Sequence, residues 1–113
     1  MVGMNCKIIK RNLIVHVSEE LDHHNAEIIR NKIDKIVVKE NIKCVIFDFS
    51  HTKFMDSSGI GVIIGRYKNI KNRGGNVVVA SVGPRMDRIF NMSGLYRIIN
   101  RYENVKEALN DVS

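Results

Sequence analysis

The stretch CVIFDFSHTKFMDSSGIGVIIGRYKNIKNRGGNVVVA, residues 44–80, decides the fold class. Its two ends, residues 44–49 and 76–80, are short runs that are apolar at almost every position, which is typical of strands buried on both faces of a parallel sheet. Between them, residues 57–72 carry apolar side chains in steps of three and four, the spacing of a helix stripe: Ile60, Ile63, Ile64, Tyr67 and Ile70. The stretch therefore predicts a strand, a crossover helix and a second, parallel strand.

The segments before this unit add a hairpin and a helix. Residues 4–9 and 13–17 are short runs rich in Ile and Val, and the polar residues 10–12 between them indicate a tight hairpin. Residues 22–40 have helical spacing, with Asp22 as a favourable N-cap. The apolar stripe of this helix consists of Ala26, Ile29, Ile33, Ile36 and Val37.

The segments after the central unit continue the alternation of helix and strand. Pro84 suits the first position of a third helix, which Gly94 ends. The apolar face of that helix consists of Met86, Ile89 and Phe90. Residues 97–100 indicate a fifth strand, and Asn104 with Glu107 has the spacing of a capping box before a C-terminal helix.

The chain length fits one small domain. With 113 residues, 44% hydrophobic and 27% charged, the composition is that of a soluble globular protein able to hold a core. We therefore predict an α/β fold with one domain over residues 1–113, in which a small mixed, mostly parallel β-sheet of four to five strands is packed with about four helices. No apolar stretch approaches the roughly 18 residues of a membrane span, and residues 1–12 lack an apolar signal segment. We expect a cytoplasmic protein without direct membrane insertion.

The cysteines and the charges point to no cofactor and no nucleic acid. Cys6 and Cys44 lie in strand-like runs without CxxC spacing, so we expect buried free thiols and not a disulfide or a metal site. The net charge of +6 is concentrated in residues 41–101, which carry ten Lys and Arg against three Asp and Glu. A basic segment suits nucleic acid, an acidic protein surface or solvent alone. No RRM, KH or helix-turn-helix signature accompanies it, and we expect three of its basic residues to be solvated: Arg66, Lys68 and Lys71.

The two adjacent serines, Ser57 and Ser58, lie where a loop passes from the carboxyl end of a predicted strand into a helix. In open parallel sheets, functional sites lie at this edge. A nucleophile elbow requires glycine two residues before the serine, but Met55 and Asp56 stand there. No histidine is marked by its position as a catalytic base. We therefore expect no catalytic residues and no enzyme activity.

The glycines after the serines do not match a nucleotide-binding loop. Gly59, Gly61 and Gly65 are spaced GxGxxxG and not GxGxxG, and Arg66 and Tyr67 stand where a P-loop has Lys and then Ser or Thr. Glycine inside a helix costs about 1 kcal/mol relative to alanine. Gly61 and Gly65 share a helix face, so they indicate close approach of this helix to its own sheet or to a partner. We adopt the contact with its own sheet as our interpretation.

For the serines themselves, local chemistry allows two roles. Serine is a favoured N-cap, worth about 1 kcal/mol over alanine, so one serine can cap the helix while the other is free. Asp56 adds negative charge near the positive end of the helix dipole. A phosphate is also favourable at a helix N-terminus, so a phosphoserine here is compatible with the fold.

Three segments carry a resemblance to a known family: ELDHHNAE (20–27), FMDSSGIGVIIGRYKNIKNRGG (54–75) and FNMSGLYRII (90–99). With them the chain resembles, over nearly its whole length, the anti-sigma F factor antagonists of spore-forming bacteria, a family of single STAS domains. DSSG marks the wider class of STAS antagonists, whereas GRYK and MSGL are more specific to the sporulation members. The resemblance implies a protein-binding module without cofactors.

The resemblance also implies a switch between partners. The unmodified antagonist binds the anti-sigma F factor, which is a serine kinase, and so frees sigma F for forespore transcription. The kinase phosphorylates the second serine of the motif, which is Ser58 here. The phosphorylated antagonist releases the kinase, and a membrane-associated PP2C-type phosphatase restores the unmodified form.

We expect the partner-binding surface to surround Ser58, with Ser57 as the helix cap or a local hydrogen-bond partner. Its candidate residues are His23, His24, Met55, Asp56, Ser57, Gly59, Ile60, Gly61 and Ile64. Three alternatives stay open. One is a STAS antagonist in a stress-response module, one is a nucleic-acid-binding domain that uses the basic segment, and one is a weak nucleotide-binding or hydrolysing activity.

Overall fold

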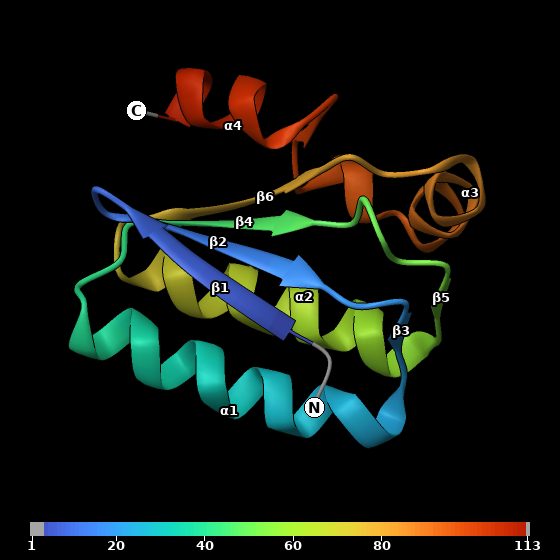
Figure 1. Ribbon diagram of the computed structural model, residues 1–113, viewed down its shortest axis with the longest axis horizontal. Coiled ribbons are helices and arrows are strands. Elements are labelled where there is room, and N and C mark those ends of the chain that lie inside the picture. The colour runs from blue at the N-terminus through green and yellow to red at the C-terminus, as the bar shows by residue number, and fades with distance from the viewer. Residues whose placement is uncertain (1–3, 113) are drawn as a thin grey trace.

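A five-stranded sheet with the order β1-β2-β4-β6-β7 forms the centre of the computed structural model, which describes residues 4–112 (Figure 1). The strands are β1 (Met4–Ile9), β2 (Asn12–Val17), β3 (Glu20–Leu21), β4 (Cys44–Asp48), β5 (Phe54–Met55), β6 (Asn76–Ala80) and β7 (Arg101–Tyr102). The helices are α1 (His23–Lys39), α2 (Ser57–Asn72), α3 (Pro84–Ser93), the short 3-10 helix η1 (Leu95–Arg97) and α4 (Val105–Val112). Within this sheet β1 is antiparallel to β2 and the other neighbours are parallel, which confirms the predicted mixed α/β architecture.

The helices cover the sheet unequally. α1 and α2 lie side by side below it in Figure 1, α3 lies near one end, and α4 lies above it. Strand side chains alternate between the two faces, so Val15, Phe47 and Val79 belong to the large core with α1 and α2. Ile46 and Val78 belong to a smaller core under α4. Among the described residues, no helix is long and apolar enough to cross a membrane.

The predicted start of α1 and both predicted ends of α3 are confirmed. The Asp22 carboxylate accepts from the Asn25 N–H at 3.1 Å and caps α1. Pro84 begins α3, and Gly94 ends it with a left-handed φ of 79°. At the predicted capping-box position, Asn104 Oδ1 accepts from the Glu107 N–H at 2.9 Å, and the Asn104 side-chain amide donates to Glu107 Oε2 at 3.4 Å.

The predicted fifth strand, residues 97–100, is wrong in position. The chain turns at η1, where the Ile99 N–H donates to the Leu95 carbonyl at 3.0 Å, and pairs with β6 only afterwards, at Arg101–Tyr102. Ile99 lies in this turn, and its apolar side chain is buried in the core. Strands β3 and β5, of two residues each, were not predicted.

The prediction that Arg66 is solvated is also wrong. Arg66 is 8% exposed, and its Nε lies 2.9 Å from Asp34 Oδ1 on α1. Burial lowers the pKa of the Arg66 guanidinium, and the nearby Asp34 carboxylate opposes that shift. The buried stripe of α2 is therefore turned toward α1 and includes Val62, whereas Ile64 is half-buried.

Both cysteines are free thiols, Cys44 buried and Cys6 half-buried. Burial raises the pKa of the Cys44 thiol to about 11. Residues 4–112 contain no group of three His, Cys, Asp or Glu side chains placed to hold a metal ion.

Candidate functional site

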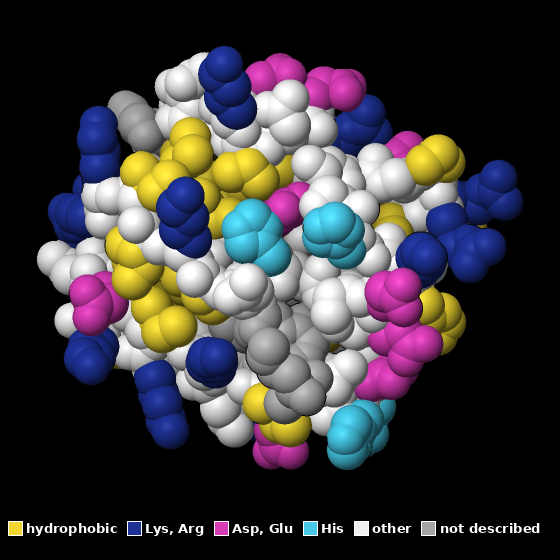
Figure 2. Space-filling model, viewed as in Figure 1, with side chains coloured by type: hydrophobic (Ala, Val, Ile, Leu, Met, Phe, Trp, Pro, Cys, Tyr) yellow, Lys and Arg dark blue, Asp and Glu magenta, His cyan; other side chains and the backbone are white. Residues whose placement is uncertain are grey.

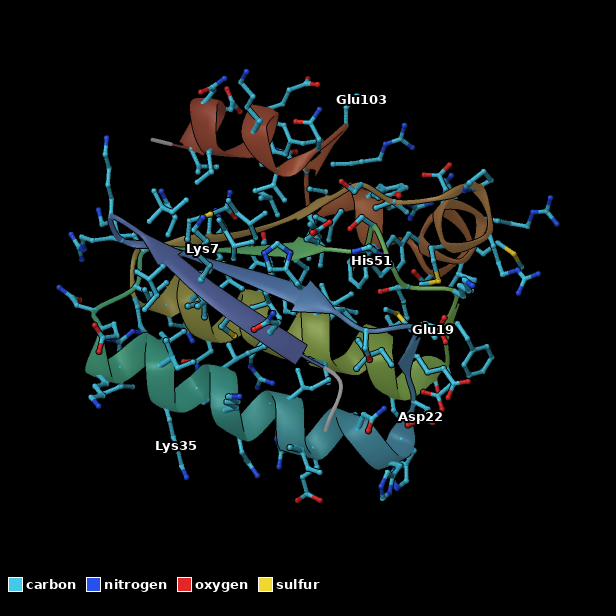
Figure 3. The ribbon with its side chains drawn as sticks, viewed as in Figure 1. Lys7, Glu19, Asp22, Lys35, His51 and Glu103 are labelled. Carbon is cyan, nitrogen blue, oxygen red and sulfur yellow. The ribbon has the colours of Figure 1, made fainter. Side chains whose placement is uncertain are left out.

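The N-termini of α1 and α2 are held side by side by a second, two-stranded sheet. β3 and β5 pair in parallel, so Glu20 lies opposite Phe54 and Leu21 opposite Met55. Each strand is followed by one aspartate and then by a helix. Two separate segments of the chain thus make the same strand–aspartate–helix turn next to each other, and Figure 3 shows Glu19 and Asp22 at this edge of the molecule.

Asp56 joins the two helix ends. Its Oδ1 accepts from the Ser58 N–H at 2.9 Å, and its Oδ2 accepts from the His23 N–H at 3.2 Å. Unpaired N–H groups at a helix start need such acceptors. Asp56 is therefore the N-cap of α2, which corrects the prediction that Ser57 caps this helix. Ser57 stands one position later, as the first helical residue, with an exposed side chain.

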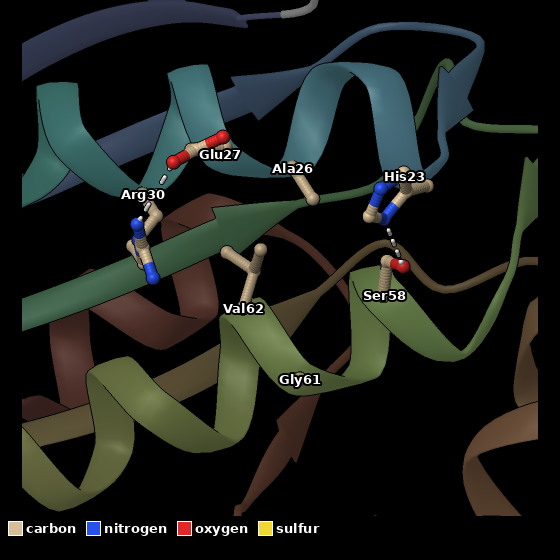
Figure 4. Close-up of a pocket in the computed structure, with 7 residues that line it drawn as sticks. All are labelled: His23, Ala26, Glu27, Arg30, Ser58, Gly61 and Val62. Atoms are coloured by element: carbon tan, nitrogen blue, oxygen red, sulfur yellow. Dashed lines mark hydrogen bonds and ion pairs between the residues drawn. The ribbon is translucent and has the colours of Figure 1, made fainter.

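The hydroxyl of Ser58 faces α1. Its Oγ lies 3.3 Å from His23 Nδ1, and the Ser58 side chain is half-buried (Figure 4). A hollow of about 280 Å³ opens between the two helices beside this pair. Its lining residues are His23, Ala26, Glu27, Arg30, Ser58, Gly61 and Val62. Arg30 and Glu27 were not among the predicted site residues, although both follow His23 at helical spacing.

Two of the predicted site residues, Met55 and Gly59, are buried below the exposed surface at the start of α2. Met55 is 3% exposed, and Gly59 is buried against it. A Cβ at Gly59 would lie 2.3 Å from Met55 Cγ and 2.9 Å from the Leu21 carbonyl oxygen. Glycine at this position therefore lets α2 approach the β3–β5 pair closely.

The interpretation that Gly61 and Gly65 let α2 approach its own sheet is wrong. A Cβ at either position would meet no atom within 4 Å, and Gly61 is exposed. The missing side chains instead leave the surface of α2 open. His24 is exposed at the second position of α1, and Ile60 is half-buried on α2.

A second polar cluster lies at the carboxyl end of β4, on the face of the sheet that carries α4. His16 Nδ1 lies 2.6 Å from Asp48 Oδ2, and the Ser50 hydroxyl donates to the same carboxylate oxygen at 3.2 Å. Because Ser50 donates to Asp48 and not to a histidine, this cluster does not have the serine–histidine–aspartate order of a hydrolase. On this face, hydrophobic side chains are visible between α4 and the β1–β2 hairpin (Figure 2).

Comparison with known proteins identifies the family. The model of the STAS domain matches residues 4–108, and the chain belongs to the STAS-domain family. It is 40% identical to an anti-sigma F factor antagonist of Paenibacillus polymyxa over 100 residues, which cover 88% of this chain and 86% of that protein. An anti-sigma-B factor antagonist of Listeria monocytogenes is 31% identical over 96 residues, 85% of this chain and 82% of that one.

Solved structures agree with this assignment. The anti-sigma factor antagonist SpoIIAA in its unphosphorylated form superposes with a TM-score of 0.88 at 28% identity, over 97% of this chain and 96% of that one. The phosphorylated form of the Bacillus protein SpoIIAA superposes with a TM-score of 0.80 at 28% identity, over 98% and 100% of the two chains. The predicted STAS fold is therefore confirmed.

Proposed function

We propose that this protein is an anti-sigma factor antagonist of the sporulation type. Its unmodified form binds an anti-sigma F factor and thereby releases sigma F for forespore transcription. The observation that carries the proposal is the hydroxyl of Ser58 at the rim of the α1–α2 hollow, in a chain 40% identical to an anti-sigma F factor antagonist. The protein acts as a cytoplasmic binding module of one domain, without cofactor, metal or enzymatic activity of its own.

The switch is phosphorylation of Ser58 by the anti-sigma factor acting as a serine kinase. The Ser58 Oγ forms a bond to the γ-phosphorus of ATP while the bond from that phosphorus to the bridging oxygen breaks and ADP leaves. The hydroxyl proton passes to a base on the kinase. A PP2C-type phosphatase reverses the modification by hydrolysis, which transfers the phosphoryl group to water.

Phosphate added here prevents binding without refolding the domain. It brings about −1.5 to −2 charge and three acceptor oxygens to a helix N-terminus, where negative charge is favourable. At an interface, the same group places an unpaired charge and additional bulk against the partner, which costs several kcal/mol. The contact surface consists of the exposed His23, His24, Ser57 and Gly61 with the half-buried Asp56, Ile60 and Ile64, supported from below by Met55 and Gly59.

The test is incubation with an anti-sigma F factor and ATP, followed by mass mapping of the modified peptide. We expect one phosphate on Ser58 and none in Ser58→Ala. In the matched control Ser57→Ala, the phosphate should still map to Ser58. Ser58→Ala should still bind the kinase, and Ser58→Asp should bind at least about tenfold more weakly, a difference of about 1.4 kcal/mol. Phosphate on Ser57, or undiminished binding by Ser58→Asp, would contradict the proposal.

A second candidate is an antagonist of an anti-sigma-B factor, favoured by the 31% identical relative from Listeria monocytogenes. The two functions differ in the partner and not in the chemistry. Titration of the protein against purified anti-sigma F and anti-sigma-B factors separates them. We expect tight binding to the first, and preference for the second would assign the chain to a stress-response module.

A further inference from the structure

The hollow beside Ser58 has groups suited to a phosphate. His23, Glu27 and Arg30 follow one another at steps of four and three on α1, so one face of this helix presents them toward α2. Ser58 and Gly61 line the opposite wall. The hydroxyl that receives the phosphate in the proposed function therefore lies beside His23 at one end of the hollow, and Arg30 lies toward the other end, beyond Val62 (Figure 4).

His23 is in position to donate to a group attached to Ser58. Its Nδ1 already lies 3.3 Å from the Ser58 Oγ. A phosphoryl oxygen extends beyond that Oγ. His23 Nδ1 donates to it when the ring is protonated, or when it is neutral with its proton on Nδ1. The neighbouring His24, also exposed, does not line the hollow.

Arg30 is the second donor, and its present partner holds it weakly. Arg30 Nη2 lies 3.5 Å from Glu27 Oε1, with the two side chains 47% and 75% exposed. Exposed pairs of this kind contribute little. A phosphate dianion is a stronger partner for a guanidinium than a solvated carboxylate, because it carries about −1.5 to −2 charge and three acceptor oxygens, whereas a carboxylate carries a single negative charge and two acceptor oxygens.

The hollow also has room for the phosphate. Its volume is about 280 Å³, and Gly61 on its α2 wall has no Cβ to fill it. Ala26 and Val62 add small apolar side chains. Glu27 and Asp56 are the negative groups near this space and oppose an anion, so binding depends on the balance between them and the two basic residues.

We propose that His23 and Arg30 form an intramolecular phosphate-binding site, which holds the phosphate of phosphorylated Ser58 in the α1–α2 hollow and stabilises the phosphorylated form. The inference rests on the proposed phosphorylation of Ser58. In the phosphorylated form, the Arg30 guanidinium leaves the Glu27 carboxylate and pairs with the phosphate. His23 then donates to a phosphoryl oxygen in place of its contact with the Ser58 hydroxyl. The site prolongs the inactive state, because a phosphatase has to break these contacts before it reaches the phosphorus.

The test uses full-length protein in which phosphoserine is incorporated at position 58 during translation, so that no kinase is needed. Phosphorus NMR follows the second ionisation of the phosphate in the otherwise wild-type protein and in His23→Ala, Arg30→Ala and the matched control His24→Ala. We expect the midpoint in the wild type to lie about one pH unit below that of a phosphoserine peptide, since nearby donors favour the dianion. The midpoint should return toward the peptide value in the first two variants and stay low in His24→Ala.

A second readout separates binding from a general effect on folding. Removal of His23 or Arg30 should lower the Tm of the phosphorylated protein more than that of the unmodified protein, whereas His24→Ala should change both equally. Identical midpoints in all four proteins and equal Tm changes would overturn the inference. The phosphoserine is incorporated during translation, so this test does not depend on the kinase. A negative result here would not contradict the proposed kinase reaction, and a negative kinase assay would not affect this measurement.

Discussion

Asp56 shows how one side chain fixes the geometry of the whole site. Its two oxygens accept from two different helices, from Ser58 at 2.9 Å and from His23 at 3.2 Å. Asparagine offers one acceptor oxygen and serine one hydroxyl, so neither replaces both contacts. The local sequence indicates a favourable negative charge at the start of α2, but the second partner of Asp56 is 33 residues away along the chain, so no local pattern reveals it.

Because Asp56 accepts from two helices and the Asp22 cap bond uses one oxygen, substitution by asparagine should destabilise the protein more at position 56 than at position 22. Asp56→Asn should destabilise the fold by about 1–2 kcal/mol, because one helix N–H loses its acceptor. Asp22→Asn is the matched control, since the Asp22 cap bond uses one oxygen, to the Asn25 N–H, and an asparagine side chain caps a helix equally well. Urea unfolding of both variants measures the difference, and equal stabilities would contradict the double role of Asp56.

The glycines of α2 give a second prediction at this scale. Gly59→Ala should cost about 1–3 kcal/mol, because the new Cβ meets Met55 and the Leu21 carbonyl. Gly61→Ala should instead stabilise the free protein by about 1 kcal/mol, since its Cβ meets nothing and alanine favours the helix. Thermal unfolding checks both signs. The stabilised Gly61→Ala protein should nevertheless bind the anti-sigma factor less tightly if this open surface is the contact.

At the scale of elements, the pairing of α1 with α2 depends on contacts that periodicity did not reveal. Local signals predicted both helices, the Asp22 cap of α1 and the strands β1, β2, β4 and β6, but they assigned the cap of α2 to Ser57 and not to Asp56. They did not reveal β3 and β5, since two residues are too few to show a period. They also misplaced Arg66, whose burial requires Asp34 on another helix.

The buried Arg66–Asp34 pair leads to a third prediction. Asp34→Ala should destabilise by about 1–3 kcal/mol, less than a fully buried pair, because the Asp34 side chain is 36% exposed. Adding Arg66→Met to that variant should recover much of the loss, because it removes the buried charge that has no partner. A double-mutant cycle measures the coupling, and additive losses would show that the pair does not join the helices.

On the scale of the whole molecule, the sheet separates two helical layers that pack over different cores. One face carries α1, α2 and the large core that positions the serines. The other face carries α4 over a smaller core of Ile14, Cys44, Ile46, Val78, Ala80 and Ala108. The order of strands and helices predicted a small mixed sheet packed with helices, but not how the helices divide between its two faces or which face carries the hollow.

The alkylation rate of the Cys44 thiol measures how firmly α4 packs on the smaller core. Its pKa of about 11 leaves little thiolate at pH 8, and α4 shields the sulfur, so alkylation in the native state should be slow. In a Cys6→Ser protein, which isolates this thiol, reaction with a maleimide should proceed through opening of the structure. Replacing the buried Ala108 with glycine should accelerate labelling by loosening α4, and rapid labelling of the parent would contradict the buried position.

The β3–β5 pair also sets the angular phase of the two helices. A single residue separates each strand from its helix, and a helix turns about 100° per residue. An insertion in the loop between β4 and β5 leaves that phase unchanged, whereas one extra residue between Met55 and Asp56 rotates the whole of α2 by more than a quarter turn. Ser58 would then point away from His23 while both helices stayed intact. We therefore expect the proposed switch to tolerate changes in the length of this loop, but not an insertion of one residue between β5 and α2.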